Sequence, residues 1–531
     1  MRKISLIIIT IASLCGASCK KYLNINQNPN APTVTNPQLE LPLAIVNAAQ
    51  LTSNMNDYGG QTVGYAANAG GYGGFGSLWT YDYTASQGEG YWDLGYQTLE
   101  NFQYIINLTA KDPSNANYDA VAKIMKAYIF QALVDEFGDI PYTQALLGGN
   151  DFRPTYDSAA TIYPKLASLI DSAIAEMSPS ATPVPSGSDP VFNGNMTQWA
   201  QFGNSLKLRL IIRASSVVTF PNMTFSSDGF LTNDAIVQPG YTLALVASGS
   251  EVSPSWSAWV ANYAGSRSGQ AWVPAYFVYG YYDGTKLTDD VRGENIYFGW
   301  PSDSVNQLGI TPPNNTKTSP FNAGAWYSGS GSGTGLGNAT GVMKGPNMGE
   351  PLMLLAESDF LQAEADLEGI LTGNAKTDFN NGIAASFGYL EEGPNATSGN
   401  SGPALSGYAG TTYATDAAAY QAANSTSYLA NYDKALNKAQ QLEAIITQKY
   451  IALNFINGEE AWSEYRRTGY PVSSGSSLNN PYGSMASTQS QATRPDHLPT
   501  RLPYPASEAA TNASNVPQGI SVYTTTIFWA Q

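Results

Sequence analysis

Aromatic residues gather in parts of the chain where they could bind a sugar. Five of the ten tryptophans fall between residues 256 and 326, and Trp79 lies beside Tyr81 and the glycine-rich stretch 71–76. Flat ring faces pack against the C–H bonds of a sugar, while amides and carboxylates bond its hydroxyls. We therefore predict a ligand-binding set of Trp79, Tyr81, Trp256, Trp272, Trp300 and Trp326. For each ring taken singly, burial in the core is the alternative, because a large ring removes much apolar area from water.

Polar residues beside these rings are weaker candidates for the same ligand. They are Asn262, Arg267, Gln270 and Asp283, whose alternative is a solvated loop. Residues 71–76 also match the pattern G-x-G-x-x-G. A dinucleotide site would need a strand before this pattern and a helix opening after it. The Tyr- and Gly-rich surroundings instead favour a ligand-facing loop.

Catalytic and metal chemistry has few residues to draw on. The single histidine, His497, would have to serve any Ser–His–Asp enzyme, and no G-x-S-x-G motif is present. One His and two Cys exclude a His-rich metal site, a four-cysteine zinc site and an iron–sulfur cluster. The acidic pairs Asp289-Asp290 and Glu391-Glu392 could ligate Ca²⁺, although the spacing D-x-D-x-D-G is absent. We expect a protein that is not an enzyme and has no cofactor. A structural Ca²⁺ ion and a glycosidase pair among the 41 acidic residues stay open.

The charge balance narrows the possible partners. The chain has 531 residues, with 25 Lys+Arg against 41 Asp+Glu, so its formal net charge is −16. An acidic chain without a long basic run lacks the electrostatic footprint of a nucleic-acid binder. Charged residues make up only 12% of the chain, about half the usual share. The surface is therefore expected to be neutral and polar.

The first residues predict a lipid anchor. Arg2 and Lys3 precede an apolar segment at 4–14, and Gly16-Ala17-Ser18-Cys19 follows it. Small residues before a cysteine, directly after such a segment, are typical of a bacterial lipoprotein signal peptide. We predict residues 1–18 as the signal peptide and Cys19 as the lipidated first residue of the mature chain. An ordinary signal peptide with an incidental cysteine is the alternative. No other apolar run reaches about 18 residues, so the protein is expected to be anchored to a membrane rather than to span one.

Helical periodicity indicates the frame that must position the rings. Apolar stripes predict four helix pairs, at 92–108 with 118–137, 158–177 with 197–218, 350–371 with 376–390, and 434–454 with 459–467. Pairs of this size favour tetratricopeptide-like packing. The stretches 219–349 and 391–431 lack such stripes. We divide the mature chain into 19–218 with two pairs, an irregular ligand-facing subdomain at 219–349 with a few short strands, and 350–531 with two pairs, within one compact unit.

Five motifs resemble those of the SusD/RagB family, which comprises outer-membrane nutrient-binding lipoproteins of Bacteroidota, and in particular its SusD-like subgroup. The start of the mature chain at 19–30 and the helix end with Gly138-Asp139-Ile140-Pro141-Tyr142 are similar to family motifs. So are the helix at 199–210, the segment 459–471 with Arg466-Arg467, and the closing segment at 501–515. The motifs follow the family's order from residue 19 to residue 515.

The resemblance implies a fold and a role. The fold is mainly α, with four tetratricopeptide-like helix pairs forming a right-handed superhelical scaffold packed against an irregular, loop-rich subdomain. The role is that of a cell-surface lid on a TonB-dependent, SusC-like transporter, which captures an oligosaccharide and passes it to the barrel. A peptide-binding lid of a RagB-like importer and a non-catalytic helical-repeat scaffold are the alternatives. The family's ligand residues vary between members, so the resemblance assigns none here.

Overall fold

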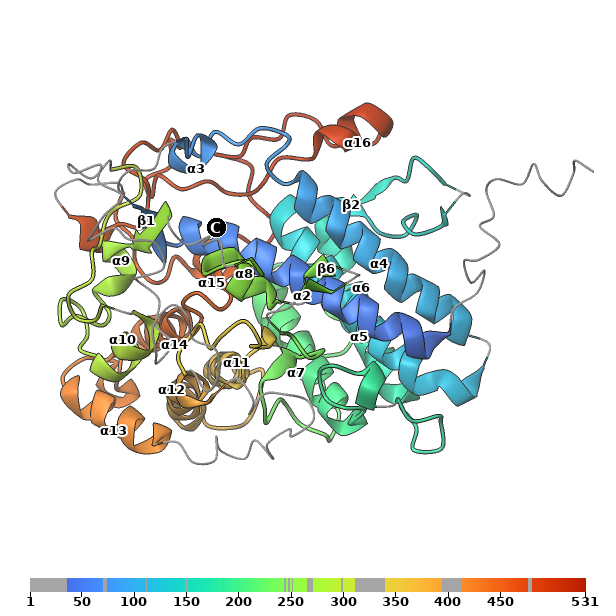
Figure 1. The fold of residues 1–531 in the computed structure, drawn as a ribbon, viewed down its shortest axis with the longest axis horizontal. Coiled ribbons are helices and arrows are strands. Elements are labelled where there is room, and N and C mark those ends of the chain that lie inside the picture. The colour runs from blue at the N-terminus through green and yellow to red at the C-terminus, as the bar shows by residue number, and fades with distance from the viewer. Residues whose placement is uncertain are drawn as a thin grey trace, which may run out of the picture.

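The eight helices of the predicted pairs form within a few residues of their expected bounds. In the computed structural model, the described residues are 36–69, 74–110, 112–148, 151–184, 186–242, 245–246, 249–250, 252–264, 271–297, 299–310, 340–393, 412–475 and 480–531. Helices α4 (Glu89–Thr109) and α5 (Ala116–Phe137) pack together, as do α6 (Ala159–Glu176) and α7 (Met196–Ala214). Helices α11 (Leu355–Glu368) and α12 (Ala375–Glu391) form the third pair, and α14 (Lys438–Ala452) with α15 (Gly458–Thr468) the fourth. Figure 1 shows these helices side by side through the centre of the molecule.

Asparagine side chains begin several of these helices. In α7, α12, α14 and α15 the residue before the helix is an asparagine whose side-chain oxygen accepts a backbone N–H of the first turn. Such a cap satisfies one of the four N–H groups that a helix start leaves without a partner. The pairs are thus delimited locally, by residues that the sequence shows directly.

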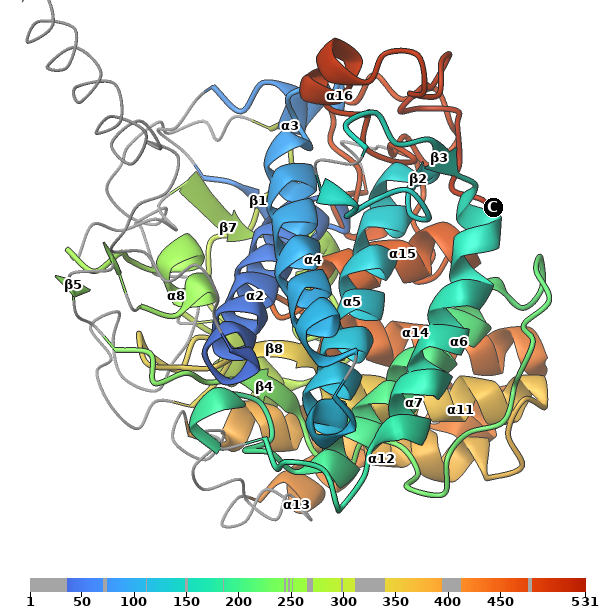
Figure 2. The same cartoon turned by 90° about the vertical axis from the view of Figure 1, so that its right-hand side faces the viewer.

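Two of the longer described helices lie outside the predicted pairs. Helix α2 (Pro37–Thr62) runs between α4 and α8 (Pro254–Trp259), as Figure 2 shows, and is buried on most of its surface in its second half. A helix covered on several sides carries no single apolar stripe, which is why periodicity does not reveal it. Helix α13 (Tyr413–Ala423) forms within the stretch 391–431, so the prediction of irregular chain was wrong for these residues. The remaining helices are short, namely α3 (Ser77–Thr80), α9 (Tyr276–Tyr279), α10 (Asp290–Ile296) and α16 (Ala506–Thr511).

Strands are few and short in the described residues, and each pairs with one other strand in antiparallel fashion. Strand β1 (Ala66–Asn68) pairs with β7 (Trp272–Pro274), and β4 (Ala235–Val237) with β8 (Glu350–Met353). The other two pairs are β2 (Ile140–Pro141) with β3 (Tyr156–Asp157), and β5 (Leu245–Val246) with β6 (Gly249–Ser250). The first two pairs each join a segment within 219–349 to a helical segment far away in the chain.

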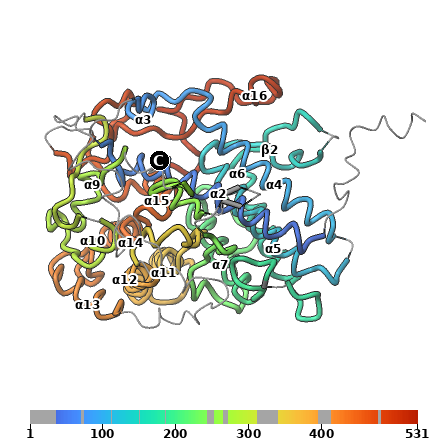
Figure 3. Tube along the Cα trace, in the orientation of Figure 1, coloured from blue at the N-terminus to red at the C-terminus, as the bar shows by residue number. Residues whose placement is uncertain are grey.

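One hydrophobic core holds the helices and the irregular segment together. It contains Leu99 of α4, Trp259 of α8 and Leu453 after α14, all fully or almost fully buried. The last residue, Gln531, donates its backbone N–H to the Arg466 carbonyl of α15, so the chain end lies against that helix (Figure 3). Stability therefore comes from contacts between segments distant in sequence rather than from separate units.

Helices α2 and α15 approach each other so closely that only glycine fits between them. A Cβ atom placed on Gly59 would lie 2.4 Å from the backbone nitrogen of Glu459, and one on Gly458 would lie 2.2 Å from the nitrogen of Gly60. Such distances are far below van der Waals contact. The two glycines thus set the spacing of the helices that carry the buried charges described next.

A network of buried charges joins α5, α7, α14 and α15. The Arg213 guanidinium lies 2.6 Å from a carboxylate oxygen of Asp135, 2.6 Å from one of Glu460 and 3.2 Å from one of Glu464. The Lys449 ammonium lies 2.7 Å from Glu460 and 3.2 Å from Glu464. Charges removed from water are tolerated only when they are paired and hydrogen-bonded in this way.

Arg466 extends the network, so it is a structural arginine. Its guanidinium lies 2.8 Å from Glu136 and 3.1 Å from Glu459, and Arg209 on α7 lies 3.0 Å from Glu357 on α11. Several of the chain's few charged residues therefore lie inside the fold. This agrees with the neutral, polar surface expected from the composition.

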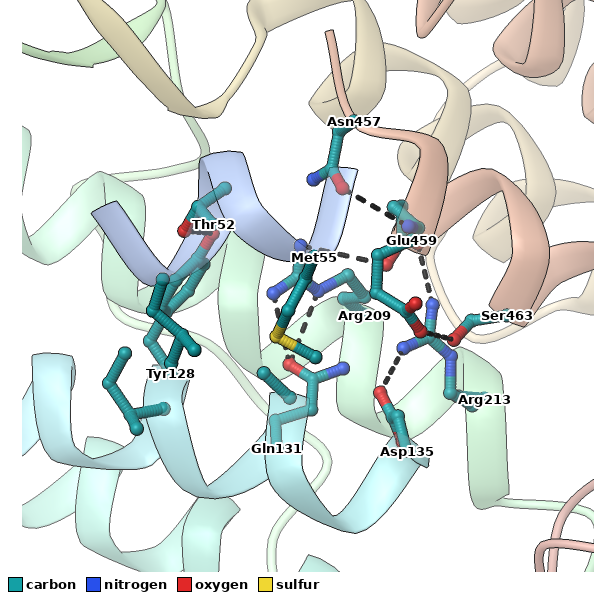
Figure 4. A pocket seen from close by; sticks show the side chains of 14 residues that line it. Thr52, Met55, Tyr128, Gln131, Asp135, Arg209, Arg213, Asn457, Glu459 and Ser463 are labelled. Atoms are coloured by element: carbon teal, nitrogen blue, oxygen red, sulfur yellow. Dashed lines mark hydrogen bonds and ion pairs between the residues drawn. The ribbon is translucent and has the colours of Figure 1, made fainter. Parts of the chain in front are cut away.

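A small, partly open cavity of about 40 Å³ adjoins this network (Figure 4). It is lined on one side by Arg209 and Gln131, and on the other by Arg213 and Asp135. Within the described residues, Gln131 Nε2 and Glu459 Oε2 are buried without a protein hydrogen-bond partner. A cavity of this size holds a water molecule or two, not a sugar ring. We conclude that it belongs to the structural network.

Candidate ligand-binding surface

Two of the predicted tryptophans meet at a cluster of half-buried rings. The Phe75 ring stacks on Trp79 of α3, with centroids 5.2 Å apart and an interplanar angle of 12°. The same ring meets Trp272 of β7 edge-on, also at 5.2 Å. All three side chains are partly exposed. Phe75 thus brings together two tryptophans that are 193 positions apart in the sequence.

The pairing of β1 with β7 positions Trp272. Asn68 stands opposite Trp272, while the neighbouring Val273 turns into the core. Alternation along a strand places successive side chains on opposite faces, so a buried Val273 leaves Trp272 on the outer side. Asn68 fixes this strand pair further, because its side chain accepts from the Gly309 N–H and donates to the Ile310 carbonyl.

A second group of rings follows on α9. Tyr276 meets Tyr482 edge-on, with centroids 5.2 Å apart. Tyr482 is partly exposed, and its hydroxyl donates to Asp283 at 3.1 Å. Asp283, a predicted polar partner, is exposed, so its carboxylate is accessible to a ligand hydroxyl.

Trp300 forms a third group and is half-buried. Its ring packs over Gly293 of α10, where a Cβ atom would lie 2.7 Å from the indole. Tyr279 of α9 lies 5.2 Å from it between centroids, and the indole N–H donates to Asp290 at 3.3 Å. The flat, side-chain-free surface of Gly293 therefore lets the indole lie against the helix while part of it faces solvent.

These three groups make up what we call the aromatic surface: Phe75, Trp79, Trp272, Tyr276, Tyr482 and Trp300. Tyr276 follows Trp272 by four residues, and Tyr279, which contacts Trp300, is one helical turn further on. The groups therefore follow one continuous segment from β7 through α9. Figure 1 shows α3, β1, α9 and α10 at the same end of the molecule.

Two of the six predicted residues are buried instead. Tyr81 is 1% exposed, and its hydroxyl accepts the backbone N–H of Ser487 at 3.0 Å, while burial raises its pKa. Trp256 is 6% exposed on α8, which packs against α2. A buried ring cannot offer its face to a sugar, so these two residues are core residues here and leave the ligand-facing set.

The other predicted residues have varied placements. Trp326, Arg267, Gln270 and the lipidation candidate Cys19 lie outside the described residues. Asn262 is partly exposed, and its side-chain oxygen accepts the backbone N–H of Ala264. It therefore stabilises its own turn.

The electrostatic character of the aromatic surface is acidic. Asp283, Asp290 and a third carboxylate, Asp303, lie beside its rings. Burial raises the pKa of Asp303 to about 6. Lys286 lies nearby, with its ammonium 3.6 Å from the centroid of the Phe277 ring, and burial lowers its pKa to about 7. Carboxylates beside partly exposed rings can accept hydrogen bonds from hydroxyl groups.

The acidic pairs considered for Ca²⁺ are engaged by protein groups. Asp289 caps α10 and pairs with Arg292, and Glu391 accepts the backbone N–H of Thr412 at 2.8 Å. Within the part of the chain that the structure describes, no group of three or more His, Cys, Asp or Glu residues is arranged to hold a metal ion. Nothing in this region therefore supports the calcium alternative.

Comparisons with known proteins decide the family. A family model described as "Starch-binding associating with outer membrane" matches residues 29–505. The chain belongs to this SusD-like family. No curated protein matches the sequence.

Solved structures confirm the SusD-like fold. A chitin-binding protein aligns with a TM-score of 0.64 and 21% identity, over 93% of this chain and 100% of that one. A chitin-binding SusD homologue from Flavobacterium johnsoniae aligns with a TM-score of 0.62 and 22% identity, over 92% and 98%. A SusD/RagB family protein from Bacteroides thetaiotaomicron aligns with a TM-score of 0.68 and 18% identity, over 93% and 99%. The mainly helical fold with four tetratricopeptide-like pairs is thus confirmed for this SusD-like chain.

Three residues of the aromatic surface were missed by sequence reasoning. Phe75 lies in the glycine-rich loop, Tyr276 lies in a run with five aromatic residues at 276–282, and Tyr482 lies in a segment rich in Ser, Gly and Asn. The run at 276–282 was the available signal for an aromatic segment, although four of its five rings lie in the core and only Tyr276 is partly exposed. Among the described helices of this SusD-like protein, none is both long and apolar enough to cross a bilayer.

Proposed function

We propose that this SusD-like protein is a cell-surface lipoprotein that binds oligosaccharides on the aromatic surface and delivers them to a TonB-dependent, SusC-like transporter. Binding involves no covalent chemistry and no cofactor. The observation that carries the proposal is the set of half-buried rings at one end of the molecule, with Asp283 and Asp290 beside them. The description of the family model, as starch-binding and associating with the outer membrane, supports the same role.

The arrangement of the rings suits a glycan better than a small charged ligand. Each ring is held at its edge or on one face by another ring or by glycine, as with Trp300 on Gly293 and Trp79 on Phe75. Rings fixed in this way lose little conformational freedom when a sugar packs on them. The chitin-binding proteins of similar fold bind a glycan, which supports the assignment of the ligand class.

Isothermal titration calorimetry against a panel of oligosaccharides tests the proposal. We expect Trp272→Ala, and separately Trp300→Ala, to weaken binding about tenfold, since an aromatic contact contributes roughly 1 kcal/mol or slightly more. Phe152→Ala is the matched control, because Phe152 is 80% exposed on the loop between β2 and β3 and should leave binding unchanged. Thermal unfolding of each variant shows that the fold is intact.

Two outcomes would count against the proposal. If the double variant Trp272→Ala/Trp300→Ala binds the best oligosaccharide as tightly as the wild type, the aromatic surface is not the site. If short peptides bind and no oligosaccharide does, the protein is a peptide-binding lid. If chromatography shows that the ligand is cleaved during the titration, the protein is an enzyme.

The lipid anchor and the transporter are tested in cells. Metabolic labelling with a fatty acid should mark the wild-type protein and not Cys19→Ala; label that persists in the variant contradicts the anchor. A SusC-like receptor should co-purify with the wild-type protein from detergent-solubilised outer membranes. Co-purification of other surface proteins without a receptor would favour the scaffold alternative.

A further inference from the structure

A second pocket lies away from the aromatic surface, at the third helix pair. It has a volume of about 650 Å³ and opens to solvent between the segment 228–232, helices α11 and α12, and the first residue of α13. The charged or ring-bearing residues that line it are Asp228, Phe230, Asp359, Asp378 and Tyr413. Helices α11 to α13 lie in the lower half of Figures 1 and 2, whereas α3 lies at the top.

Asp359 of α11 faces this pocket without a partner. Its side chain is only 9% exposed, yet it forms no hydrogen bond or ion pair with any described residue. Two other acidic residues of the same helix are buried and paired, since Glu357 meets Arg209 at 3.0 Å and Glu364 meets Arg467 at 2.7 Å. The fold thus supplies an arginine to each of these carboxylates and supplies nothing to Asp359.

The charged groups around Asp359 in this pocket are all acidic. Asp378 of α12 lines the same pocket, and Asp234 lies behind it, where its carboxylate accepts the Leu355 N–H at 2.7 Å. Burial, and then Asp378 and Asp234, raise the pKa of Asp359 well above its ordinary value. Burial and the neighbouring Asp366 of α11 raise the pKa of Asp378 to about 7. Asp228 completes the set, and none of the residues lining the pocket is a cation.

A pocket lined by carboxylates without a cation is suited to a positively charged ligand, and its other lining residues indicate which kind. The described residues offer no cluster of three or more metal-ligating side chains, so the carboxylates do not converge on a single ion. The volume instead lies within the range of small-molecule sites, about 300–1,000 Å³. The rings of Phe230 and Tyr413 are suited to an organic cation, because ring faces attract an ammonium group.

We propose that this pocket binds a ligand that carries a primary ammonium group, held by the carboxylates of Asp359 and Asp378, independently of the aromatic surface. An amino sugar and a lysine side chain of a peptide share this chemistry. Binding would favour the ionised form of Asp359, so it should release a proton from the pocket.

Calorimetry with four probes tests the proposal on the full chain. The probes are a glucosamine trimer, its N-acetylated counterpart, a Gly-Lys-Gly peptide with a blocked N-terminus and the same blocked peptide with acetylated lysine. We expect an amine-bearing probe to bind and its acetylated partner not to compete for this pocket. Binding of the glucosamine trimer alone identifies an amino sugar, binding of the peptide alone identifies lysine, and binding of both supports the shared chemistry.

Variants separate this pocket from the aromatic surface. Asp359→Asn should weaken binding of the amine probe at least tenfold and reduce the dependence of the measured heat on buffer ionisation, to which Asp378 still contributes. Glu368→Gln removes one charge from the same helix, at its exposed pair with Lys438, and should change neither. Trp272→Ala should leave amine binding intact even if it abolishes oligosaccharide binding, so the two proposals fail separately. Asp378→Asn is the second variant if Asp359→Asn does not fold.

Three results would overturn the inference. Equal binding of the amine probe to wild type and both Asp variants would place the amine elsewhere. Equal affinity for the acetylated and free amines at this pocket would show that charge is not recognised. Displacement of the amine by millimolar Ca²⁺, with the same sensitivity to Asp359→Asn, would indicate a metal site.

Discussion

Removing the Arg213 side chain should destabilise the protein more than any change to a surface ion pair. Arg213 is almost fully buried and makes three charge-assisted contacts, at 2.6, 2.6 and 3.2 Å, with Asp135, Glu460 and Glu464. Replacement by methionine, which has a similar length, removes the ion pair of Asp135 and leaves Glu460 and Glu464 with fewer cations beside them. Breaking a buried pair on one side typically costs about 3–5 kcal/mol.

The magnitude can be converted into a melting temperature. The unfolding entropy of about 2.1 cal/mol/K per residue gives roughly 1 kcal/mol/K for a chain of about 500 residues. Arg213→Met should therefore lower the Tm by about 3–5 °C in differential scanning calorimetry at pH 7.5. Lys438→Met is the matched control, since it breaks the exposed pair with Glu368 and should cost about 0–1 kcal/mol.

The stability lost in Arg213→Met should depend on pH, and its direction can be worked out from Glu464. Burial opposes ionisation of Glu464, but Arg467, Lys449 and Arg213 together hold its pKa well below the ordinary value. Such a group stabilises the fold above its unfolded pKa of about 4.5, and that stability is lost as pH falls through the folded pKa. The difference between wild type and Arg213→Met should thus be largest above about pH 5 and shrink below it. A loss no larger than that of Lys438→Met, or one that does not change with pH, would refute the assignment of the network as the central stabilising feature.

The remaining predictions concern packing and a second buried carboxyl. Gly59→Ala should cost at least about 1–3 kcal/mol in urea unfolding, because its methyl group would meet the Glu459 backbone at 2.4 Å. Gly90→Ala, on α4 with nothing within 4 Å, should be neutral or stabilising by up to about 1 kcal/mol; equal losses in both variants would contradict the close approach of α2 and α15. Burial raises the pKa of Glu350 to about 8, although Ser255 donates to it, so the folded state holds a proton that the unfolded state has lost. This group should therefore lower the free energy of unfolding of the wild type as pH rises from about 4.5 to 8. Glu350→Gln lacks this loss, so its free energy of unfolding relative to the wild type should rise from pH 5.5 to pH 8, by at most about 1.4 kcal/mol per pH unit. A difference that stays constant over this range would show that Glu350 does not titrate there.

The helix pairs could be predicted because their signals are local. Apolar stripes at a spacing of three to four residues, with Asn195, Asn374, Asn437 and Asn457 as caps, act within a single helix and are visible in one stretch of sequence. Helix α2 gives no such stripe, since α4, α8 and α15 cover it from several sides. Its burial depends on which helices surround it, and no local pattern records that.

The exposure of each aromatic ring depended on distant contacts. Trp79 and Tyr81 are two residues apart, yet Trp79 is half-buried while Tyr81 is buried against Ser487, 406 positions away. Trp256 and Trp272 lie in the same irregular stretch, and α2 covers the first while the pairing of β7 with β1 turns the second outward. Rings that are close in sequence, or of the same type in the same stretch, therefore reached different environments.

The amino-acid sequence by itself determined the family, the helix pairs and the concentration of rings in the segment that joins them. It could not determine which rings face solvent or that Arg213, Arg466 and Lys449 lie inside. Periodicity and capping arise from the geometry of one helix, whereas burial is a property of the surface that remains after all segments have packed. Only the tertiary structure decides that surface, because the residues covering a given side chain come from anywhere in the chain.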